Sequence, residues 1–160
     1  VSLIFTALIR TLIGLVPAII LTSPLFGISI LELGFPLLLL FLSLYIFGVT
    51  LGLFVSAGLI RYGPSFENIA WSSLFLLAPL GCIYYPIEIL PNFFQIIAKG
   101  LPLVYIFDET RNILLNGFIN YENLRTAYFL NFIYLVAAIT LFYISFLRAR
   151  VKGTLINMGE

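Results

Sequence analysis

Histidine is absent from the 160-residue sequence, cysteine occurs once, and charged residues make up only 9% of the chain. Without histidine, the commonest general base and the commonest metal ligand are missing. A single cysteine excludes an internal disulfide and any cysteine-based metal cluster. The net charge of +1 gives no reason to expect a nucleic-acid partner. No G-x-x-x-x-G-K-[ST] loop is present, so we expect neither nucleotide binding of that kind nor any other cofactor in this chain.

Apolar residues dominate what remains. They account for 62% of the chain, and the mean hydropathy is +1.15. Soluble domains are about one quarter charged, and a domain of this size cannot bury so much apolar surface. The sequence therefore predicts an all-α membrane protein with a single transmembrane domain over residues 1–160. Uncharged runs long enough to cross a bilayer predict four transmembrane helices, at about 11–30, 33–60, 68–85 and 126–147.

One apolar stretch, residues 79–111, is too interrupted to cross as a helix. It contains four prolines and two glycines, and proline removes a backbone donor and clashes with the preceding turn. Irregular backbone at membrane depth survives only where protein or a water-filled cavity satisfies its polar groups. We therefore predict a re-entrant helical hairpin over about 87–117, with one helix at 87–98 and another at 103–115.

The basic residues indicate the orientation of the chain. Under four spans, Arg10, Arg61 and the cluster Arg148, Arg150 and Lys152 fall on one side, and most of them lie next to a span end. The positive-inside rule then places both ends of this chain in the cytoplasm and the hairpin at the outer leaflet. Because the chain begins with Val1 rather than Met, we also expect it to be a fragment.

Several smaller patterns carry predictions. Gly48, Gly52 and Ser56 repeat at four-residue spacing, which suits either packing within the bundle or the seam to a second subunit. Ser65 can cap the helix that follows it. Cys82 is interpreted as a small apolar filler.

Three charged residues close the interrupted stretch. Asp108 and Arg111 are spaced to pair on a helix, either as a local ion pair or as a gate element touched by substrate. The adjacent Asp108 and Glu109 are expected to diverge by about 100° instead of converging on one site.

The span ending in PLGCIYYPIEILP, the hairpin, the segment LPLVYIFDETR and a last span with a basic tail together resemble the type-two ABC exporter permeases, which include polysaccharide and drug exporters. The resemblance covers the C-terminal two-thirds of that family's six-span permease, so two spans would be missing. It implies a non-catalytic subunit in the plasma (inner) membrane that pairs with a second permease copy and with two separate ATPase subunits, which bind the ATP. It assigns an outer gate to a set of residues in and around the hairpin: Pro79, Gly81, Tyr85, Pro86, Pro91, Pro102, Tyr105, Asp108 and Arg111. It also implies an ATPase-facing surface near Arg10, Arg61 and Tyr62.

Two other classes of function stay open. An ATP-independent secondary transporter or channel fragment predicts ionisable residues inside the spans, and the four predicted spans contain none. A membrane-bound lipid-modifying enzyme needs convergent acids, histidines or an activated nucleophile, and only the neighbourhood of Asp108 and Arg111 offers any of these.

Overall fold

The computed structural model describes residues 5–14, 16–17, 34–117 and 119–152. Every regular element in these residues is helical, which confirms the all-α prediction. A short helix, Phe5–Gly14, comes first. The remaining elements are α2 (Gly34–Tyr62), α3 (Phe66–Leu80), the 3-10 helix η2 (Ile87–Ile89), α4 (Asn92–Ala98), α5 (Pro102–Asn116) and α6 (Tyr121–Lys152).

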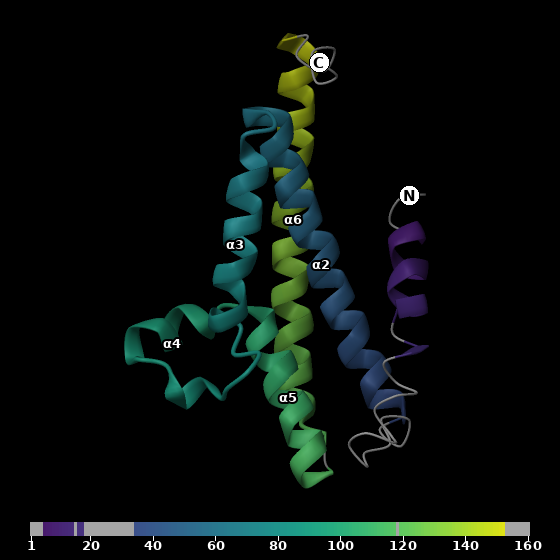
Figure 1. Cartoon of the computed structure of the whole chain (residues 1–160), viewed down its shortest axis with the longest axis vertical. Coiled ribbons are helices and arrows are strands. Elements are labelled where there is room, and N and C mark those ends of the chain that lie inside the picture. Colours follow the sequence, from purple (N-terminus) through teal and green to yellow (C-terminus); the bar gives the residue numbers. More distant parts are fainter. Residues whose placement is uncertain (1–4, 15, 18–33, 118, 153–160) are drawn as a thin grey trace.

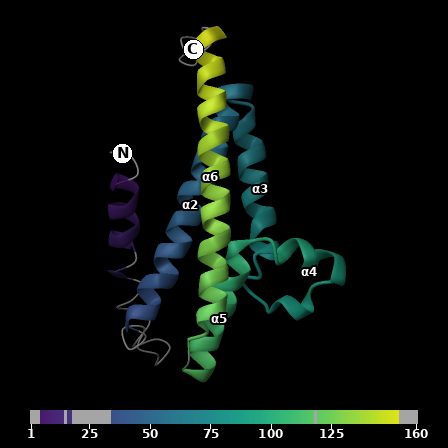
Figure 2. The ribbon, with the colours of Figure 1, turned by 180° about the vertical axis from the view of Figure 1, so that it is seen from behind.

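The long helices α2 and α6 lie side by side and form the largest helix–helix contact of the described chain (Figures 1 and 2). Helix α5 packs along the lower part of α6, and α3 packs against α2. Helix α4 projects sideways from this bundle, near the lower end of α3 (Figure 1). The interrupted stretch thus forms one flank of the bundle.

Two helices of the described chain, Gly34–Tyr62 and Tyr121–Val151, are long and apolar enough to cross a membrane. Only 22% of the most apolar window of the first and 11% of that of the second are buried within the fold. The core helix of a soluble protein would be buried on most of its apolar surface, so the outward apolar side chains suit a lipid environment. The coarse prediction, a helical chain with segments able to span a membrane, agrees with the structure.

The finer prediction of four spans differs from the structure at the third and fourth spans. Helix α6 covers Tyr121–Lys152, whereas the fourth span was predicted over 126–147. Helix α3 has 15 residues and ends at Leu80, whereas the third span was predicted over 68–85. Its length is about 22 Å, short of the roughly 30 Å hydrocarbon core. Most of the predicted first span, residues 18–30, lies outside the described residues.

The N-terminal helix Phe5–Gly14 runs across the predicted start of the first span. We expected Arg10 at the water boundary and a span starting at about residue 11, and one helix contains both Arg10 and Thr11. It lies beside the middle of α2 (Figures 1 and 2). Arg10 is therefore an exposed residue within a helix rather than at its end.

Local chemistry explains both ends of α3. At its start, Ser65 occupies the cap position but makes no side-chain cap hydrogen bond, contrary to the prediction. The carbonyl groups of Gly63 and Pro64 accept the N–H groups of Phe66 and Glu67 instead, at 3.1 and 3.0 Å. At its other end, Pro79 lies in the last turn and the chain leaves the helix at Gly81.

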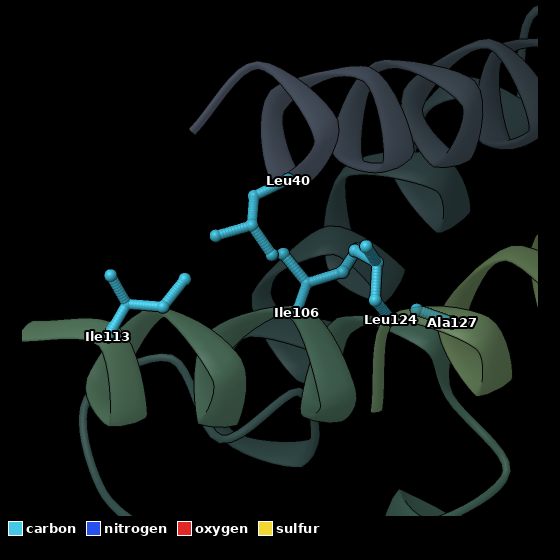
Figure 3. Close-up of a cluster of buried hydrophobic side chains, with 5 residues drawn as sticks. All are labelled: Leu40, Ile106, Ile113, Leu124 and Ala127. Carbon is cyan, nitrogen blue, oxygen red and sulfur yellow. The ribbon is translucent and has the colours of Figure 1, made fainter. Parts of the chain in front are cut away.

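A small apolar core joins the lower ends of three helices. Leu40 of α2 points toward Ile106 of α5 (Figure 3), and Ile113 of α5 with Leu124 and Ala127 of α6 complete the cluster. Each of these side chains is at most 8% exposed. This core fixes α5 against the two long helices and so positions the charged residues of α5.

Gly58 of α2 lies against the ring of Phe66 at the start of α3, and its replacement is a direct test of that contact. A Cβ at Gly58 would collide with the ring of Phe66, whereas a Cβ at Gly52, six residues earlier in α2, would meet nothing within 4 Å. Gly58→Ala should therefore lower the free energy of unfolding by roughly 1–3 kcal/mol, the usual cost of overpacking. Gly52→Ala should be neutral or stabilising by up to about 1 kcal/mol, because alanine favours the helix. Thermal unfolding of the two purified variants compares them, and equal melting temperatures would contradict the packing described here.

Candidate functional site

The turn between α3 and η2 is held by Arg111 of α5. Nη1 of Arg111 donates to the carbonyl oxygens of Cys82 at 2.9 Å and of Tyr85 at 3.1 Å. Cys82 itself has a φ of +53°, in the left-handed region that non-glycine residues rarely adopt. Such a conformation persists only where the surrounding structure enforces it. The guanidinium, arriving from a residue 29 positions later, supplies that constraint.

Cys82 is fully buried against Ala98 and Val104, which agrees with its predicted filler role. Burial raises the pKa of its thiol, with smaller opposing and reinforcing contributions from Arg111 and from the nearby carboxylates Glu88 and Asp108. A reactive thiolate needs the opposite shift and access to solvent.

Other predicted gate residues form contacts within the same segment. The hydroxyl of Tyr85 donates to the carbonyl of Pro79 at 2.9 Å, and the hydroxyl of Tyr105 donates to that of Lys99 at 3.0 Å. Pro102 is buried in the first turn of α5, where its missing N–H costs nothing. Pro86 and Pro91 precede η2 and α4 and define where those short helices begin.

Gly81 is required by close packing. A Cβ there would lie 2.9 Å from the side chain of Leu103, at the start of α5. Helix α5 can therefore approach the end of α3 only because this position has no side chain. The structure thus brings together Gly81, Tyr85, Arg111 and their partners, and we call the assembly of the α3–η2 turn with Arg111 the clasp.

The charged end of α5 forms a second cluster. Asp108 Oδ1 lies 3.8 Å from Nη2 of Arg111, so the predicted ion pair is present but loose and partly exposed. Nε and Nη2 of Arg111 are buried without a hydrogen-bond partner in the described part of the chain. Arg111 therefore acts mainly through its contact with the two carbonyl groups.

Glu109 corrects the prediction that neighbouring acids diverge. Its side chain is fully buried, accepting the backbone N–H of Asn120 at 2.5 Å and the amide of Asn123 at 3.2 Å. The same Asn123 amide reaches Asp108 Oδ2 at 3.4 Å. The two carboxylates thus meet at one side chain on α6, the helix that packs against α5.

Two further contacts join α6 to the rest of the bundle. Nδ2 of Asn131 donates to both the carbonyl and the hydroxyl oxygen of Ser43 on α2, each at 2.9 Å, while Oδ1 has no partner in the described residues. The hydroxyl of Tyr134 donates to the carbonyl of Gly100, at the turn before α5, at 2.9 Å. Sequence reasoning did not assign these contacts to Glu109, Asn123 and Asn131. Only Asn131 gave a signal, as a polar amide in a largely apolar run.

The predicted packing residues face a groove. Gly48, Gly52 and Ser56 line an apolar hollow of about 650 Å³ between α2 and the N-terminal helix, which contributes Ala7 and Thr11. A Cβ at either glycine would meet nothing within 4 Å. These small residues therefore do not mediate close packing between the helices described here.

The predicted ATPase-facing residues are only partly brought together. Arg61 lies over the ring of Tyr62 at 5.3 Å, and Tyr62 stacks on Phe66, with ring centroids 5.8 Å apart. These three residues form an exposed corner between α2 and α3. Arg10 is separate from them, because it lies in the helix beside the middle of α2.

Comparison with known proteins places the chain in no group. No protein-family model matches it, and neither the curated proteins nor the solved structures contain a significant match. Among the described residues, no group of three acidic, histidine or cysteine side chains is arranged to hold a metal ion.

Proposed function

We propose that this chain is a transmembrane permease subunit of an ATP-driven exporter, working with separate ATPase subunits and a second permease copy. The observation that best supports this proposal is the segment α3–η2–α4–α5, in which Arg111 holds the α3–η2 turn. Large apolar side chains are exposed along it, including Tyr84, Ile89 and Ile96, its irregular backbone is bound by Arg111, and a long apolar helix follows it. Irregular backbone satisfied by the protein itself is what the membrane interior requires.

The exposed apolar side chains of α4 support the proposal that this helix contacts lipid. Phe93 and Ile96 are 68% and 75% exposed on a helix that projects from the bundle. In water such a surface would be unfavourable, at roughly 25 cal/mol per Å² of apolar area. We propose that this element dips into the outer leaflet without crossing it, and that both ends of the chain face the cytoplasm.

The corner formed by Arg61, Tyr62 and Phe66 is the proposed contact with the ATPase. It lies at the end of the bundle shared by the C-terminal basic residues (Figure 1). In the proposed mechanism, ATP-driven closure of the ATPases pushes on this corner and the two permeases rock. The clasped hairpins then gate release on the outer side.

Co-purification tests the proposal. A tagged chain isolated from its native membrane in gentle detergent should bring down a protein with a G-x-x-x-x-G-K-[ST] loop and ATPase activity. Arg61→Glu should reduce the recovered ATPase activity at least fivefold, because it reverses the charge of the proposed contact surface. The matched control Lys99→Glu, in the turn after α4, should leave recovery unchanged. Recovery of no ATPase with a folded, membrane-inserted chain would contradict the exporter assignment.

A secondary transporter is the second candidate, because Glu109 is a fully buried ionisable residue. Buried acids in membrane proteins often lie on ion pathways. Against this, both oxygens of Glu109 are occupied by the backbone of Asn120 and the amide of Asn123. Transport that persists after ATP depletion and stops when an ion gradient is abolished would favour this candidate.

A further inference from the structure

Arg111 leaves one edge of its guanidinium group empty. Nη1 donates to the carbonyl oxygens of Cys82 and Tyr85, but Nε and Nη2 are buried and have no hydrogen-bond partner in the described part of the chain. These two nitrogens share one edge of the planar group, and their parallel N–H bonds match the two oxygens of a carboxylate. Native proteins rarely leave buried donors of a charged group unpaired. The empty edge is therefore a place where a carboxylate can bind.

Asp108 is the carboxylate within reach of this edge. It precedes Arg111 by three positions in α5, and residues at that spacing are neighbours on a helix. Its Oδ1 lies 3.8 Å from Nη2 of Arg111, too far for a hydrogen bond, and its Oδ2 lies 3.4 Å from Nδ2 of Asn123 on α6, which is long for one. The side chain of Asp108 is 42% exposed, so packing does not fix its rotamer. Neither partner holds the carboxylate at full hydrogen-bond geometry.

Both partners can release Asp108 at small cost. When the carboxylate leaves Asn123, the amide keeps its contact with Oε2 of Glu109 at 3.2 Å, and its freed hydrogen can meet water because Asn123 is only partly buried. When the carboxylate stays near Asn123, it keeps more of its hydration, but the edge of Arg111 remains unpaired. One position thus gains two charge-assisted hydrogen bonds and the other gains hydration. Two states that exchange one gain for another can lie close in free energy.

We propose that Asp108 is a two-position switch that exchanges between the empty edge of Arg111 and the amide of Asn123. Arg111 holds the α3–η2 turn, and Asn123 lies in the first turn of α6, so the exchange links that turn to the position of α6 against α5. Moving the start of α6 away from α5 removes the Asn123 position and drives Asp108 onto Arg111. Nη1 stays on the two carbonyls in both positions, so Cys82 stays covered. The switch is a property of this chain alone and goes beyond the exporter assignment.

NMR of the arginine Nε–H groups, on the full chain in phosphatidylcholine nanodiscs, tests the proposal. Arg111→Lys identifies the Arg111 signal by its loss. Binding to a carboxylate shifts an Nε–H proton downfield, and Asp108→Asn should abolish this shift, because an amide offers a single acceptor oxygen. We take the two positions as about equally populated, so Asn123→Ala, which removes one of them, should enlarge the downfield shift about twofold. Glu88→Gln removes an exposed acid on η2 and is the matched control, which should leave the signal unchanged.

The reciprocal effect is measured on the side-chain amide of Asn123. Arg111→Lys keeps the positive charge but has no planar edge, so Asp108 should move to Asn123. The amide signal of Asn123 should then shift in the direction opposite to the shift that Asp108→Asn causes, since coupling between two positions is reciprocal. This measurement holds even if Asn123→Ala fails to fold.

Three outcomes would overturn the switch. In the first, Asp108→Asn leaves the Nε–H signal of Arg111 in place. In the second, Glu88→Gln moves that signal instead. In the third, the Asn123 and Arg111 variants show no reciprocal effect. None of these outcomes bears on whether the chain recovers an ATPase, so failure of the switch and failure of the exporter assignment are distinguishable.

Discussion

Arg111→Met is expected to make Cys82 reactive toward a maleimide in the folded protein. The native thiol is fully buried, and it is the only cysteine of the chain, so labelling reports on the clasp alone. The substitution removes two hydrogen bonds from a cation to the carbonyls of Cys82 and Tyr85, each worth roughly 1.5–3 kcal/mol. It also leaves the left-handed conformation at Cys82 without its constraint. A net loss of about 3 kcal/mol would raise the open population, and hence the labelling rate, roughly a hundredfold.

Arg125→Met is the matched control for the clasp. Arg125 is an exposed cation on α6, and the hydrogen bonds to the turn come from Arg111, so the loss of Arg125 should leave Cys82 protected. Asp108→Asn should have a small effect as well, because the ion pair at 3.8 Å is loose and partly exposed. Equal labelling rates in Arg111→Met and Arg125→Met, with both proteins folded by circular dichroism, would show that Arg111 does not hold the turn.

Sequence reasoning located best the helices whose ends are marked by charged residues, glycine or proline. The second span was predicted over 33–60, and α2 covers Gly34–Tyr62, because an uncharged run ends at Arg61 and Gly63-Pro64 cannot continue the helix. The hairpin helices were predicted at 87–98 and 103–115. The structure replaces the first by η2 and α4, since Pro91 divides it, and gives α5 nearly the predicted bounds.

The third span was misjudged because two signals competed at its end. The aromatic pair Tyr84 and Tyr85 suits an interface anchor at the end of a span, which favours an end at residue 85. Pro79 and Gly81 decide the outcome instead, so the helix stops at Leu80 and Tyr85 turns back to donate to the carbonyl of Pro79. The proline and the glycine therefore determine where this helix ends, although the apolar composition of the segment favours a longer one.

The polar contacts of the candidate site could not be predicted, since they join residues far apart in the chain. Arg111 binds carbonyl groups 26 and 29 positions earlier, and Asn131 binds Ser43 across 88 positions. Backbone carbonyls carry no sequence signal, because every residue has one. The stretch Pro79 to Arg111 was therefore found as a group. The contacts of Glu109 within it, and that of Asn131 with Ser43, were not predicted.

The second large effect is expected at Glu109, which supports the turn between α5 and α6. In Glu109→Leu, the apolar side chain fills a similar volume, but the N–H of Asn120 and the amide of Asn123 lose their acceptor. Two hydrogen bonds to a charged group are lost, so we expect the free energy of unfolding to fall by roughly 3–5 kcal/mol. Thermal unfolding in nanodiscs measures this loss, and hydrogen exchange at Asn120 should rise in parallel, because its N–H is then unprotected.

Glu88→Leu is the control, since Glu88 is an exposed acid on η2 and its replacement should change stability by less than about 0.5 kcal/mol. Glu109→Gln separates the effect of the negative charge on stability from the effect of the side-chain shape. One of its two oxygens becomes an amide that can only donate, so it can serve Asn120 or Asn123 but not both. An intermediate loss for this variant is therefore expected. If Glu109→Leu were as stable as the native chain, the buried carboxylate would not be what holds the start of α6 against α5.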